Sequence, residues 1–422
     1  MTKRCPAGRV AAAFLASTVI LSITGMAPAL AESAQNDSGL FPSDERVLEF
    51  GTQQRNITVA PFVQFDGGYY DQDPGRSAFG SSINLARIYL FGAYDAFGGT
   101  LALDTENNAF FYRYAFVNYQ PTDRVTLQVG QQDEPFSLQD VSGSRFLPFA
   151  TSGQSAALIP GDTVGIKVSY GGDNHSISAG VFGGDVNNGV GDGGVAITGR
   201  VTWAPIYRQE EITRGGDATR EGVGTQRVTD LLHLGLGLST RRDIDGGVSF
   251  SGGTNATIPT GAASVLASSS TIAEVDALTR VNLEVARSVG SLSFQGELTA
   301  ANVKGAREDG TAHGGYLYMT YFLTGEKRGY DRSSGTFGRV VPIDPIGGGG
   351  YGAVEVGLRA DYLDLTDLGD ESGRQHGLSA VANLYMTKRL TLTADYSYAR
   401  GTAGAIDGTE SHAVTARVQF AY

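Results

Sequence analysis

Apolar and polar residues alternate one by one along most of the chain after residue 54, and helical spacing is nearly absent. Such alternation is typical of β-strands with two different faces, because successive side chains point to opposite sides of a sheet. We therefore predict an all-β protein with sixteen strands, at residues 55–66, 82–94, 97–105, 109–120, 123–132, 162–170, 174–183, 194–203, 230–240, 276–288, 291–303, 312–324, 351–364, 375–387, 389–400 and 411–422.

The predicted connections between these strands fall into two length groups. Five of them, after residues 94, 120, 170, 288 and 387, are only a few residues long. The long ones are rich in Gly, Asp and Ser and cover 133–161, 184–193, 204–229, 241–275, 325–350 and 401–410. Short periplasmic turns at one rim and long extracellular loops at the other are typical of an antiparallel transmembrane β-barrel.

The two faces of the predicted strands also fit a membrane barrel. In 351–364, one face carries Val356 and Leu358, and the other carries Glu355 and Arg359. A packed interior does not tolerate many charged side chains, whereas a water-filled lumen does. The predicted lumen-facing charges are balanced, so we expect most of them to form a salt-bridged wall: Arg113, Lys167, Arg200, Arg280, Arg359 and Arg417 against Asp104, Glu284, Glu297, Glu355, Asp361 and Asp395.

The last stretch, SHAVTARVQFAY, alternates up to its final residue, Tyr422. In bilayer hydrocarbon every backbone polar group needs a partner, so a barrel must close and its last strand must pair with the first. We expect Tyr422 at the periplasmic interface, where aromatic rings are favoured. A terminal aromatic also resembles the signal by which outer-membrane assembly machinery recognises barrels.

The first residues have the features of an export signal. Lys3, Arg4 and Arg9 precede a mostly apolar run at 10–23, and a small-residue cleavage pattern ends at Ala31. We predict a signal peptide at 1–31, a short periplasmic segment at 32–54 and the barrel at 55–422. Cys5, the only cysteine, lies inside the predicted signal peptide, so no disulfide is expected.

Composition and charge narrow the class of protein further. The formal net charge is −12, which argues against nucleic acid as a partner. The chain has 59 Gly, 19 Tyr and 20 Phe but only one Trp, a composition that is unusual for a soluble exported enzyme.

Three stretches resemble the phosphate-selective porin O/P family: TYFLTGEKRGYD (320–331), ARIYLFGAYDAFGGTLALD (86–104) and YRYAFVNYQPTDRVTLQVGQQDEPFSLQD (112–140). The resemblance implies a homotrimeric porin whose third loop, here 133–161, folds inward and narrows the pore. It also implies pore or constriction roles for Arg87, Tyr89 and Lys304. In place of a family lysine the chain carries Asp140, and Arg113 replaces an acidic residue; Asp133 and Arg145 belong to the same constriction region.

Other functions are not favoured by the residues. The five histidines, His175, His233, His313, His376 and His412, lack metal-ligand spacing, and no nucleophile-elbow motif occurs. Asp185 and Asp192 could bind calcium, although a mobile extracellular loop explains them as well. A plugged barrel with a structural or adhesive role is the alternative, since Phe136, Phe146 and Phe149 make the third loop apolar.

These observations together predict a diffusion porin of a Gram-negative outer membrane. We expect passive passage of small hydrophilic solutes or ions, either without selectivity or with a weak preference for anions such as phosphate, and no enzymatic activity, cofactor or metal.

Overall fold

The structure is a computed structural model that describes residues 49–52, 55–73, 76–106, 109–188, 193–212, 225–244, 247–258, 265–305, 309–347 and 349–422. The predicted signal peptide at 1–31 and most of the predicted segment at 32–54 lie outside these residues. Within the described part of the chain, no helix is both long and apolar enough to cross a membrane.

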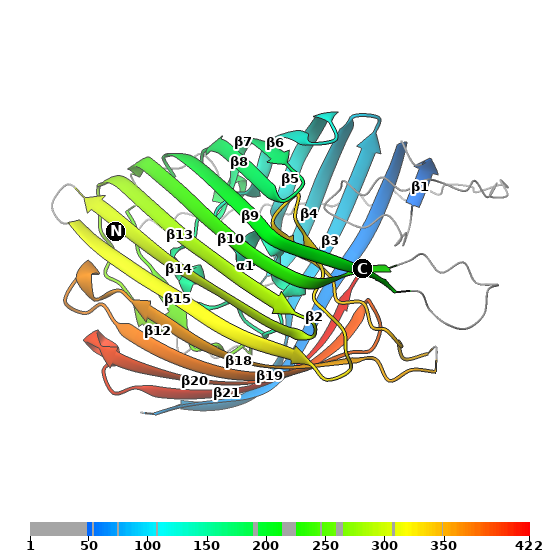
Figure 1. Cartoon of the computed structure of the whole chain (residues 1–422). Helices are drawn as coiled ribbons and strands as arrows, with labels where there is room; N and C mark the ends of the chain where they lie inside the picture. Colours follow the sequence, from blue (N-terminus) through cyan, green and yellow to red (C-terminus); the bar gives the residue numbers. More distant parts are fainter. Residues whose placement is uncertain are drawn as a thin grey trace, which may run out of the picture. The chain divides into compact units, whose positions relative to one another are not determined.

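Sixteen strands form one closed antiparallel barrel (Figure 1). They are β2 (Arg55–Asp73), β3 (Arg76–Tyr94), β4 (Phe97–Glu106), β5 (Ala109–Thr122), β6 (Val125–Asp133), β7 (Asp162–Gly171), β8 (His175–Phe182), β9 (Val195–Ile212), β10 (Thr225–Ile244), β13 (Val275–Val289), β14 (Leu292–Gly305), β15 (Asp309–Phe322), β18 (Ala353–Asp364), β19 (Arg374–Tyr385), β20 (Leu390–Ala403) and β21 (Glu410–Ala421). A short strand, β1 (Glu49–Thr52), pairs with the start of β2.

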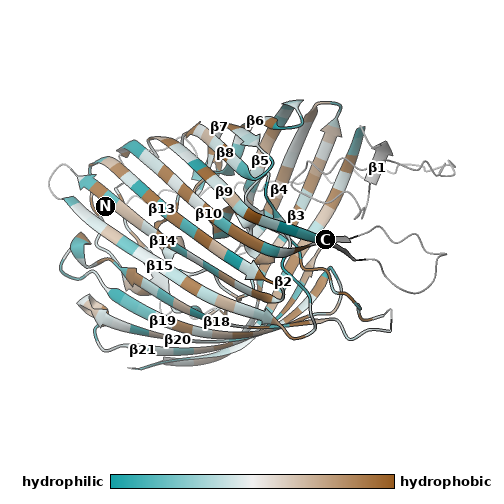
Figure 2. Cartoon of the chain, in the orientation of Figure 1, coloured by the Kyte–Doolittle hydropathy of each residue, from teal (hydrophilic) through white to brown (hydrophobic). Residues whose placement is uncertain are grey.

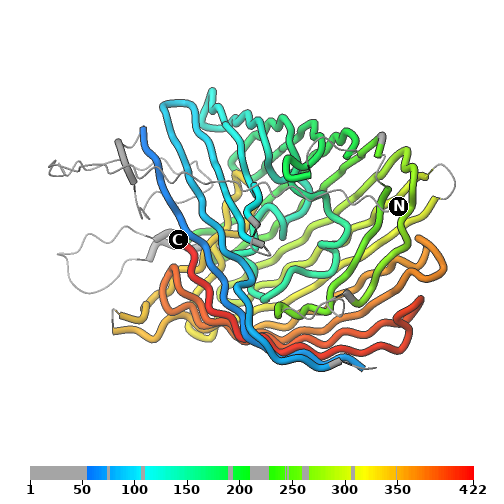
Figure 3. The backbone as a smooth tube through the Cα atoms, turned by 180° about the vertical axis from the view of Figure 1, so that it is seen from behind, coloured from blue at the N-terminus to red at the C-terminus, as the bar shows by residue number. Residues whose placement is uncertain are grey.

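The barrel closes where the sequence predicted, between the first and last barrel strands. β21 pairs with β2 from Ala421 opposite Phe62 to Glu410 opposite Asp73. Tyr422 extends the closure, because its backbone N–H donates to Pro61 O at 3.0 Å. Figure 3 shows this junction as the red strand beside the blue one. We call the end of the barrel that carries Tyr422 the C-terminal rim and the opposite end the loop rim.

The sequence predicted short connections at one rim and long ones at the other, but each rim has connections of both lengths. Antiparallel order places 213–224 and 323–352 at the C-terminal rim, together with the five short turns. The loop rim also has short connections, at 74–75, 107–108 and 306–308. Outside the hydrocarbon, water can hydrogen-bond to the backbone, so connection length is not limited there.

Each of the sixteen predicted strands is found, and β9, β10 and the two strands of the first hairpin are clearly longer than predicted. β2 and β3 continue to residues 73 and 76, where alternation predicted ends at 66 and 82. The added part contains Gly67, Gly68 and Gly80. Backbone pairing does not need an apolar face, so a strand can continue beyond the alternating residues from which it was predicted.

Hydrophobic and hydrophilic residues alternate along the barrel strands (Figure 2), and the exposed outer face carries the apolar side chains. On β18, Leu358 is 59% exposed, whereas Glu355 and Arg359 are 0% and 3% exposed. The outward side chains face lipid in a membrane, and the inward ones meet other parts of the chain that enter the lumen.

Three connections contribute inward-folded structure. The segment 134–161, which we call the constriction loop, contains helix α1 (Leu138–Ser142) and the 3-10 turns η1 (Ser144–Phe146) and η2 (Gln154–Leu158). From the loop rim comes a hairpin of β11 (Ser251–Gly253) and β12 (Val265–Ser268). From the C-terminal rim comes a hairpin of β16 (Tyr330–Asp331) and β17 (Thr336–Phe337). Three further 3-10 turns, η3 (Val186–Asn188), η5 (Thr366–Leu368) and η6 (Gly404–Ile406), lie in loop-rim connections.

Candidate constriction site

The constriction loop is held first at the start of α1. The backbone N–H groups of Leu138 and Gln139 donate to the Glu297 carboxylate on β14, at 3.0 and 2.8 Å. These N–H groups lack partners inside the helix, so a carboxylate is a suitable acceptor for them. Ser137 caps the same turn by accepting from Asp140 N. Glu297, which the sequence placed in the lumen, therefore anchors the loop.

Later parts of the loop are held by other wall strands. The Gln154 N–H donates to Asp361 on β18 at 3.0 Å, and the Ala150 N–H donates to Asp395 on β20 at 3.2 Å. In the reverse direction, Asn383 on β19 donates to Pro148 O at 2.8 Å. The Gln419 amide on β21 donates to Arg145 O at 3.1 Å. The loop thus crosses the lumen and binds to the wall formed by β14 to β21.

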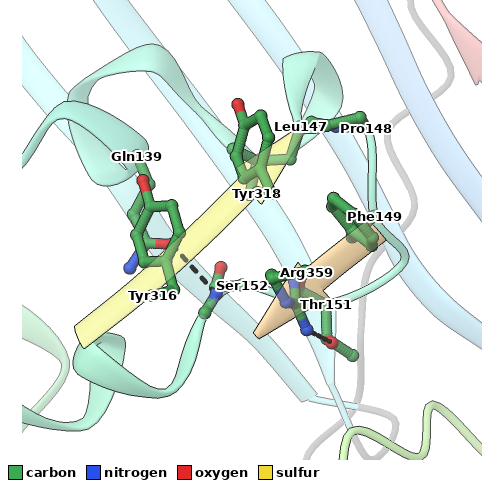
Figure 4. A pocket seen from close by; sticks show the side chains of 10 residues that line it. Gln139, Leu147, Pro148, Phe149, Thr151, Ser152, Tyr316, Tyr318 and Arg359 are labelled. Atoms are coloured by element: carbon green, nitrogen blue, oxygen red, sulfur yellow. Dashed lines mark hydrogen bonds between the residues drawn. The ribbon is translucent and has the colours of Figure 1, made fainter. Parts of the chain in front are cut away.

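The loop leaves almost no space between itself and β15 and β18 (Figure 4). Tyr316, Tyr318 and Arg359 from the wall face the loop around a cavity of only about 10 Å³. Phe149 fills this contact, with its ring 5.5 Å from that of Tyr318 and 4.7 Å from the Arg359 guanidinium. The loop is therefore closely packed against this part of the wall.

A β-bulge on β5 shapes the opposite wall of the passage. Tyr114 pairs with Ala102 and Tyr112 with Leu103, so Arg113 has no partner on β4. A bulge of this kind interrupts the alternation and turns a side chain to a new direction. Arg113 and Tyr114 both reach the lumen as a result, although they are consecutive residues.

Arg113 is the centre of a charged cluster at this wall. Its guanidinium bonds Asp133 at 2.9 Å, contacts Asp162, and lies 3.9 Å from the carboxylate of Asp140 on α1. The Tyr114 hydroxyl donates to Asp133 at 2.6 Å. The ion pair between Arg113 and Asp140 joins the wall to the loop, so it marks the narrow part of the lumen.

A second part of the cluster is built around Tyr89. Arg87 pairs with Asp104 at 2.6 Å and donates to the Tyr89 hydroxyl at 2.8 Å. From the constriction loop, the Arg145 guanidinium lies 5.0 Å from the centre of the Tyr89 ring, a cation–π distance. Arg145 thus contacts Tyr89 and joins the constriction loop to the wall at a second point.

Burial changes the charge of the two loop residues in the cluster. The pKa of Asp140 is raised to about 7, first by burial and then by the negative charge of Asp133. The pKa of Arg145 is lowered to about 10, mainly by burial. Near neutral pH, Arg145 is therefore charged, while Asp140 is ionised only in part.

Six of the seven residues singled out from the sequence come together here: Arg87, Tyr89, Arg113, Asp133, Asp140 and Arg145. Lys304 does not join them. It is exposed near the loop-rim end of β14 and shares its face with the outward residues Leu298 and Ala300. Inward-facing neighbours on β14 occupy the odd-numbered positions, such as Glu297 and Thr299.

Several members of the cluster had no predicted site role. Lys167 donates to Asp133 O at 3.4 Å, and Asp162 and Tyr114 contact the same group. Their positions in the sequence could have indicated two of these residues, because Asp162 directly follows the loop and Lys167 was on the predicted lumen face. Tyr114 could not be assigned to the lumen face from the sequence, because the bulge shifts the alternation of side chains.

The remaining lumen charges form the expected paired wall for the most part. Arg200 pairs with Glu284 at 2.8 Å, and Arg359 pairs with Asp361 at the same distance. Arg417 pairs with Asp66 across the closing strands at 2.7 Å.

No described residues gather into a group of three or more His, Cys, Asp or Glu side chains able to hold a metal. Asp192, half of the suggested calcium pair, lies outside the described residues. Asp185 accepts a hydrogen bond from Gln131 at 2.8 Å.

An antiparallel barrel with an apolar outside, a polar lumen and a loop that narrows it defines an outer-membrane porin of a Gram-negative cell. Comparison with protein families agrees: the chain belongs to the phosphate-selective porin O and P family, which matches residues 89–422.

The individual relatives have low sequence identity to this chain. Porin O of Pseudomonas aeruginosa is 25% identical over 435 residues, which cover 90% of this chain and 93% of that protein. An uncharacterised Caulobacter vibrioides protein is 28% identical over 351 residues and 78% of this chain, and the match spans 65% of its own length. The fold is that of the solved anion-selective porin from Comamonas acidovorans, with a TM-score of 0.52, 14% identity, and coverage of 87% of this chain and 100% of the other.

Proposed function

We propose that the protein is a passive diffusion channel for small hydrophilic solutes and ions, with a weak preference for anions. The observation that carries this proposal is the charge of the constriction. Arg87, Arg113, Arg145 and Lys167 stand against Asp104, Asp133, Asp140 and Asp162, and the pKa of Asp140 is close to 7. Partial protonation of Asp140 leaves a small positive excess where the lumen is narrow and screening by salt is weakest.

Reversal potentials in a KCl gradient across a planar bilayer test this proposal. We expect chloride to be moderately more permeant than potassium near neutral pH. Phosphate should compete weakly with chloride, because Asp140 opposes a doubly charged anion. A channel that prefers potassium, or one that phosphate blocks at micromolar concentration, would contradict the proposed balance of charges.

Transport in this proposal needs no chemical step. Solutes that fit through the constriction follow their gradient, and no cofactor, metal or catalytic group takes part. We also propose a homotrimer, which is supported by family membership. Cross-linking of the detergent-purified protein tests it, and monomers alone would count against it.

A plugged barrel with a structural role is a second candidate, because two hairpins besides the constriction loop fold inward. Thr257, which follows β11, contacts Ser82 and Thr415 on the wall. Tyr330 in β16 bonds His233 on β10 at 2.6 Å. Single-channel recording separates the candidates, because a plugged barrel gives no steady current.

A further inference from the structure

Two residues of the barrel wall bind the β16–β17 hairpin inside the lumen. The Arg200 guanidinium on β9 donates to the backbone oxygens of Ser334 and Gly335 in the hairpin turn, at 3.2 and 2.8 Å. The Nδ1 atom of His233 on β10 lies 2.6 Å from the Tyr330 hydroxyl on β16. The hairpin is therefore held by one charged and one titratable side chain.

A single carboxylate orients both of these residues. Glu284 on β13 accepts two hydrogen bonds from the Arg200 guanidinium, both at 2.8 Å, and lies 3.0 Å from Nε2 of His233. The side chain of Arg200 is 4% exposed, and those of His233 and Glu284 are fully buried. We call Arg200, His233 and Glu284 the hairpin anchor.

The directions of these hydrogen bonds identify the protonation state of His233. Glu284 bonds a guanidinium through both carboxylate oxygens, so it is ionised and only accepts, and Nε2 of His233 must carry the proton that it donates. Nδ1 then accepts from the Tyr330 hydroxyl, which makes no other hydrogen bond in the described part of the chain. The docked hairpin therefore matches a neutral imidazole at both ring nitrogens.

A second proton on His233 breaks this match. A protonated Nδ1 can only donate, so the hydroxyl hydrogen of Tyr330 loses its acceptor in a site that is closed to water. The added positive charge is also buried beside Arg200, which already neutralises Glu284. The docked hairpin therefore disfavours a charged imidazole.

Other titratable groups near the hairpin anchor have partners of their own. Glu297 on β14 is linked to Glu284 through the Asn282 amide, which donates to the two carboxylates at 2.8 and 3.3 Å. Glu297 also accepts from two backbone N–H groups of the constriction loop. On the hairpin side, Asp331 bonds Ser333, and Arg332 lies over the Tyr207 ring. Glu284 is thus the carboxylate that bonds the imidazole.

We propose that the hairpin anchor is a proton-sensitive device: neutral His233 keeps the β16–β17 hairpin docked, and acid releases the hairpin and removes its support from the constriction loop. The hairpin reaches that loop where the Phe337 N–H donates to Ser142 Oγ at 3.0 Å. Once the hairpin leaves, water solvates His233, which then titrates in the usual range of histidine near pH 6.5. Release should therefore become more favourable by up to about tenfold for each pH unit below about 6.5.

Thiol labelling at Thr202 on β9 measures release of the hairpin directly. Thr202 is 2% exposed, and the hairpin turn lies on it so closely that a Cβ at Gly335 would overlap its side chain. Cys5, the only natural cysteine, lies in the predicted signal peptide. In detergent-purified protein, we expect a small maleimide to label Thr202→Cys about tenfold faster at about pH 5 than at about pH 7.5. Each rate is divided by that of Asp173→Cys, whose position is 80% exposed, at the same pH. Equal relative rates at both pH values would overturn the proposal.

His233→Gln is the matched variant for this experiment. Its amide can donate to Glu284 and accept from Tyr330, but it cannot be protonated in this pH range. Labelling of Thr202→Cys in this variant should stay slow at both pH values. An acid-induced rise as large as in the parent protein would show that a carboxylate titrates, and would overturn the role of His233.

Tyr330→Phe tests the anchor without a change at His233. Loss of the hydroxyl removes the hydrogen bond to Nδ1, so labelling of Thr202→Cys should already be several-fold faster than in the parent protein at about pH 7.5. This variant also keeps the proposal testable if His233→Gln gives no heat-modifiable barrel. Unchanged labelling in Tyr330→Phe would show that the hydroxyl does not hold the hairpin, contrary to the proposal.

Single-channel recording adds a readout at the constriction. In an Asp140→Asn background, which removes the titratable carboxyl of the loop, open-channel noise should increase between about pH 7 and about pH 5. His233→Gln should abolish this increase. Acid-induced labelling without added noise would contradict the proposed support of the constriction loop by the hairpin.

The two readouts also separate this inference from the proposed channel function. Labelling of Thr202→Cys needs no conduction, so a barrel without steady current would contradict the channel and leave the hairpin anchor in place. Labelling that does not change with pH in a conducting protein would overturn the inference alone.

Discussion

At the residue scale, the selectivity of the channel depends on how charges are paired more than on how many there are. Arg113 is shared by Asp133, Asp162 and Asp140, so little of its charge is available to a passing ion. The Arg145 guanidinium lies beside the rings of Tyr89 and Phe146, at 5.0 and 4.8 Å. We expect solutes to sense the charges of Arg145 and of the titratable Asp140 carboxyl, because both side chains belong to the constriction loop.

The raised pKa of Asp140 predicts that selectivity changes with pH. Below a pKa of about 7 the carboxyl is neutral, and above it the constriction gains a negative charge. The chloride-to-potassium permeability ratio should therefore fall as the pH rises from about 6 to about 8. Asp140→Asn should keep the ratio at its low-pH value throughout. Reversal potentials that slope equally with pH in both proteins would show that another group titrates.

Reversal of the same charge should shift selectivity further. Asp140→Lys should raise the chloride-to-potassium ratio and make phosphate a stronger blocker of chloride current, because a cation replaces an anion at the narrowest point. Asp173→Lys is the control. The Asp173 side chain is 80% exposed in a turn at the C-terminal rim, where salt screens charge over about 8 Å. A similar shift in both variants would mean that the surface, not the constriction, sets the preference.

Some residues of the site were readable from the sequence and others were not. Arg87, Tyr89 and Asp140 were identified by a family resemblance, and Asp140 on α1 reaches the wall through its contact with Arg113 on β5. Tyr114 could not be placed, because a bulge breaks the period-two rule without a signal in the residue types. Lys304 matched a family position, but its place in β14 puts it on the outward face. Asp395 was expected in the salt-bridged lumen wall and instead holds the loop at Ala150.

At the scale of elements, the β16–β17 hairpin braces the constriction loop from the C-terminal rim. Arg328, just before β16, donates to Phe146 O at 3.2 Å, and its guanidinium lies 4.1 Å from the Phe337 ring centre. The Phe337 N–H donates to Ser142 Oγ at 3.0 Å. These two contacts hold both ends of the turn that carries Arg145.

Loss of this brace should loosen the constriction without opening the barrel. Arg328→Gln leaves the carbonyl of Phe146 and the Tyr318–Gln295 pair with fewer donors, which costs roughly 1–3 kcal/mol of loop stability. We expect noisier single-channel current and a shifted reversal potential at an unchanged heat-modifiable mobility. Arg208→Gln, whose side chain is 76% exposed near the same rim, is the control and should behave as wild type. A quiet current with an unshifted reversal potential in Arg328→Gln would show that Arg328 does not support the constriction loop.

At the scale of the whole molecule, the barrel was predictable because closure follows from backbone chemistry. Sixteen alternating stretches needed partners on both sides, and a last strand ending in Phe420 and Tyr422 supplied the closing pair. The inward hairpins β11–β12 and β16–β17 were not predicted. Their contacts, such as Tyr330 with His233, join residues far apart in the chain and carry no periodic pattern.

Removal of the chain end should impair assembly more than export. Tyr422 bonds Pro61 O, and its ring lies 3.8 Å from the Arg389 guanidinium. Deletion of residues 420–422 removes this closure and the aromatic end proposed to be read by the assembly machinery. The heat-modifiable form in outer membranes should therefore fall several-fold, while export to the periplasm continues. Tyr351→Ser, at an aromatic that is 88% exposed, should assemble normally. Normal amounts of the truncated barrel would contradict this role.

The way in which the constriction loop is attached affects how the solute preference of such a channel can change. The loop is held largely by its main chain: wall side chains bind the N–H groups of Leu138, Gln139, Ala150 and Gln154 and the carbonyls of Arg145 and Pro148, and Arg328 binds the carbonyl of Phe146. Every residue type except proline offers the same N–H and C=O groups. Side chains such as those of Asp140 and Arg145 can therefore be exchanged while the scaffold stays in place. Natural selection or protein engineering can change the side chains of the constriction one residue at a time, without altering the main-chain contacts that support the loop.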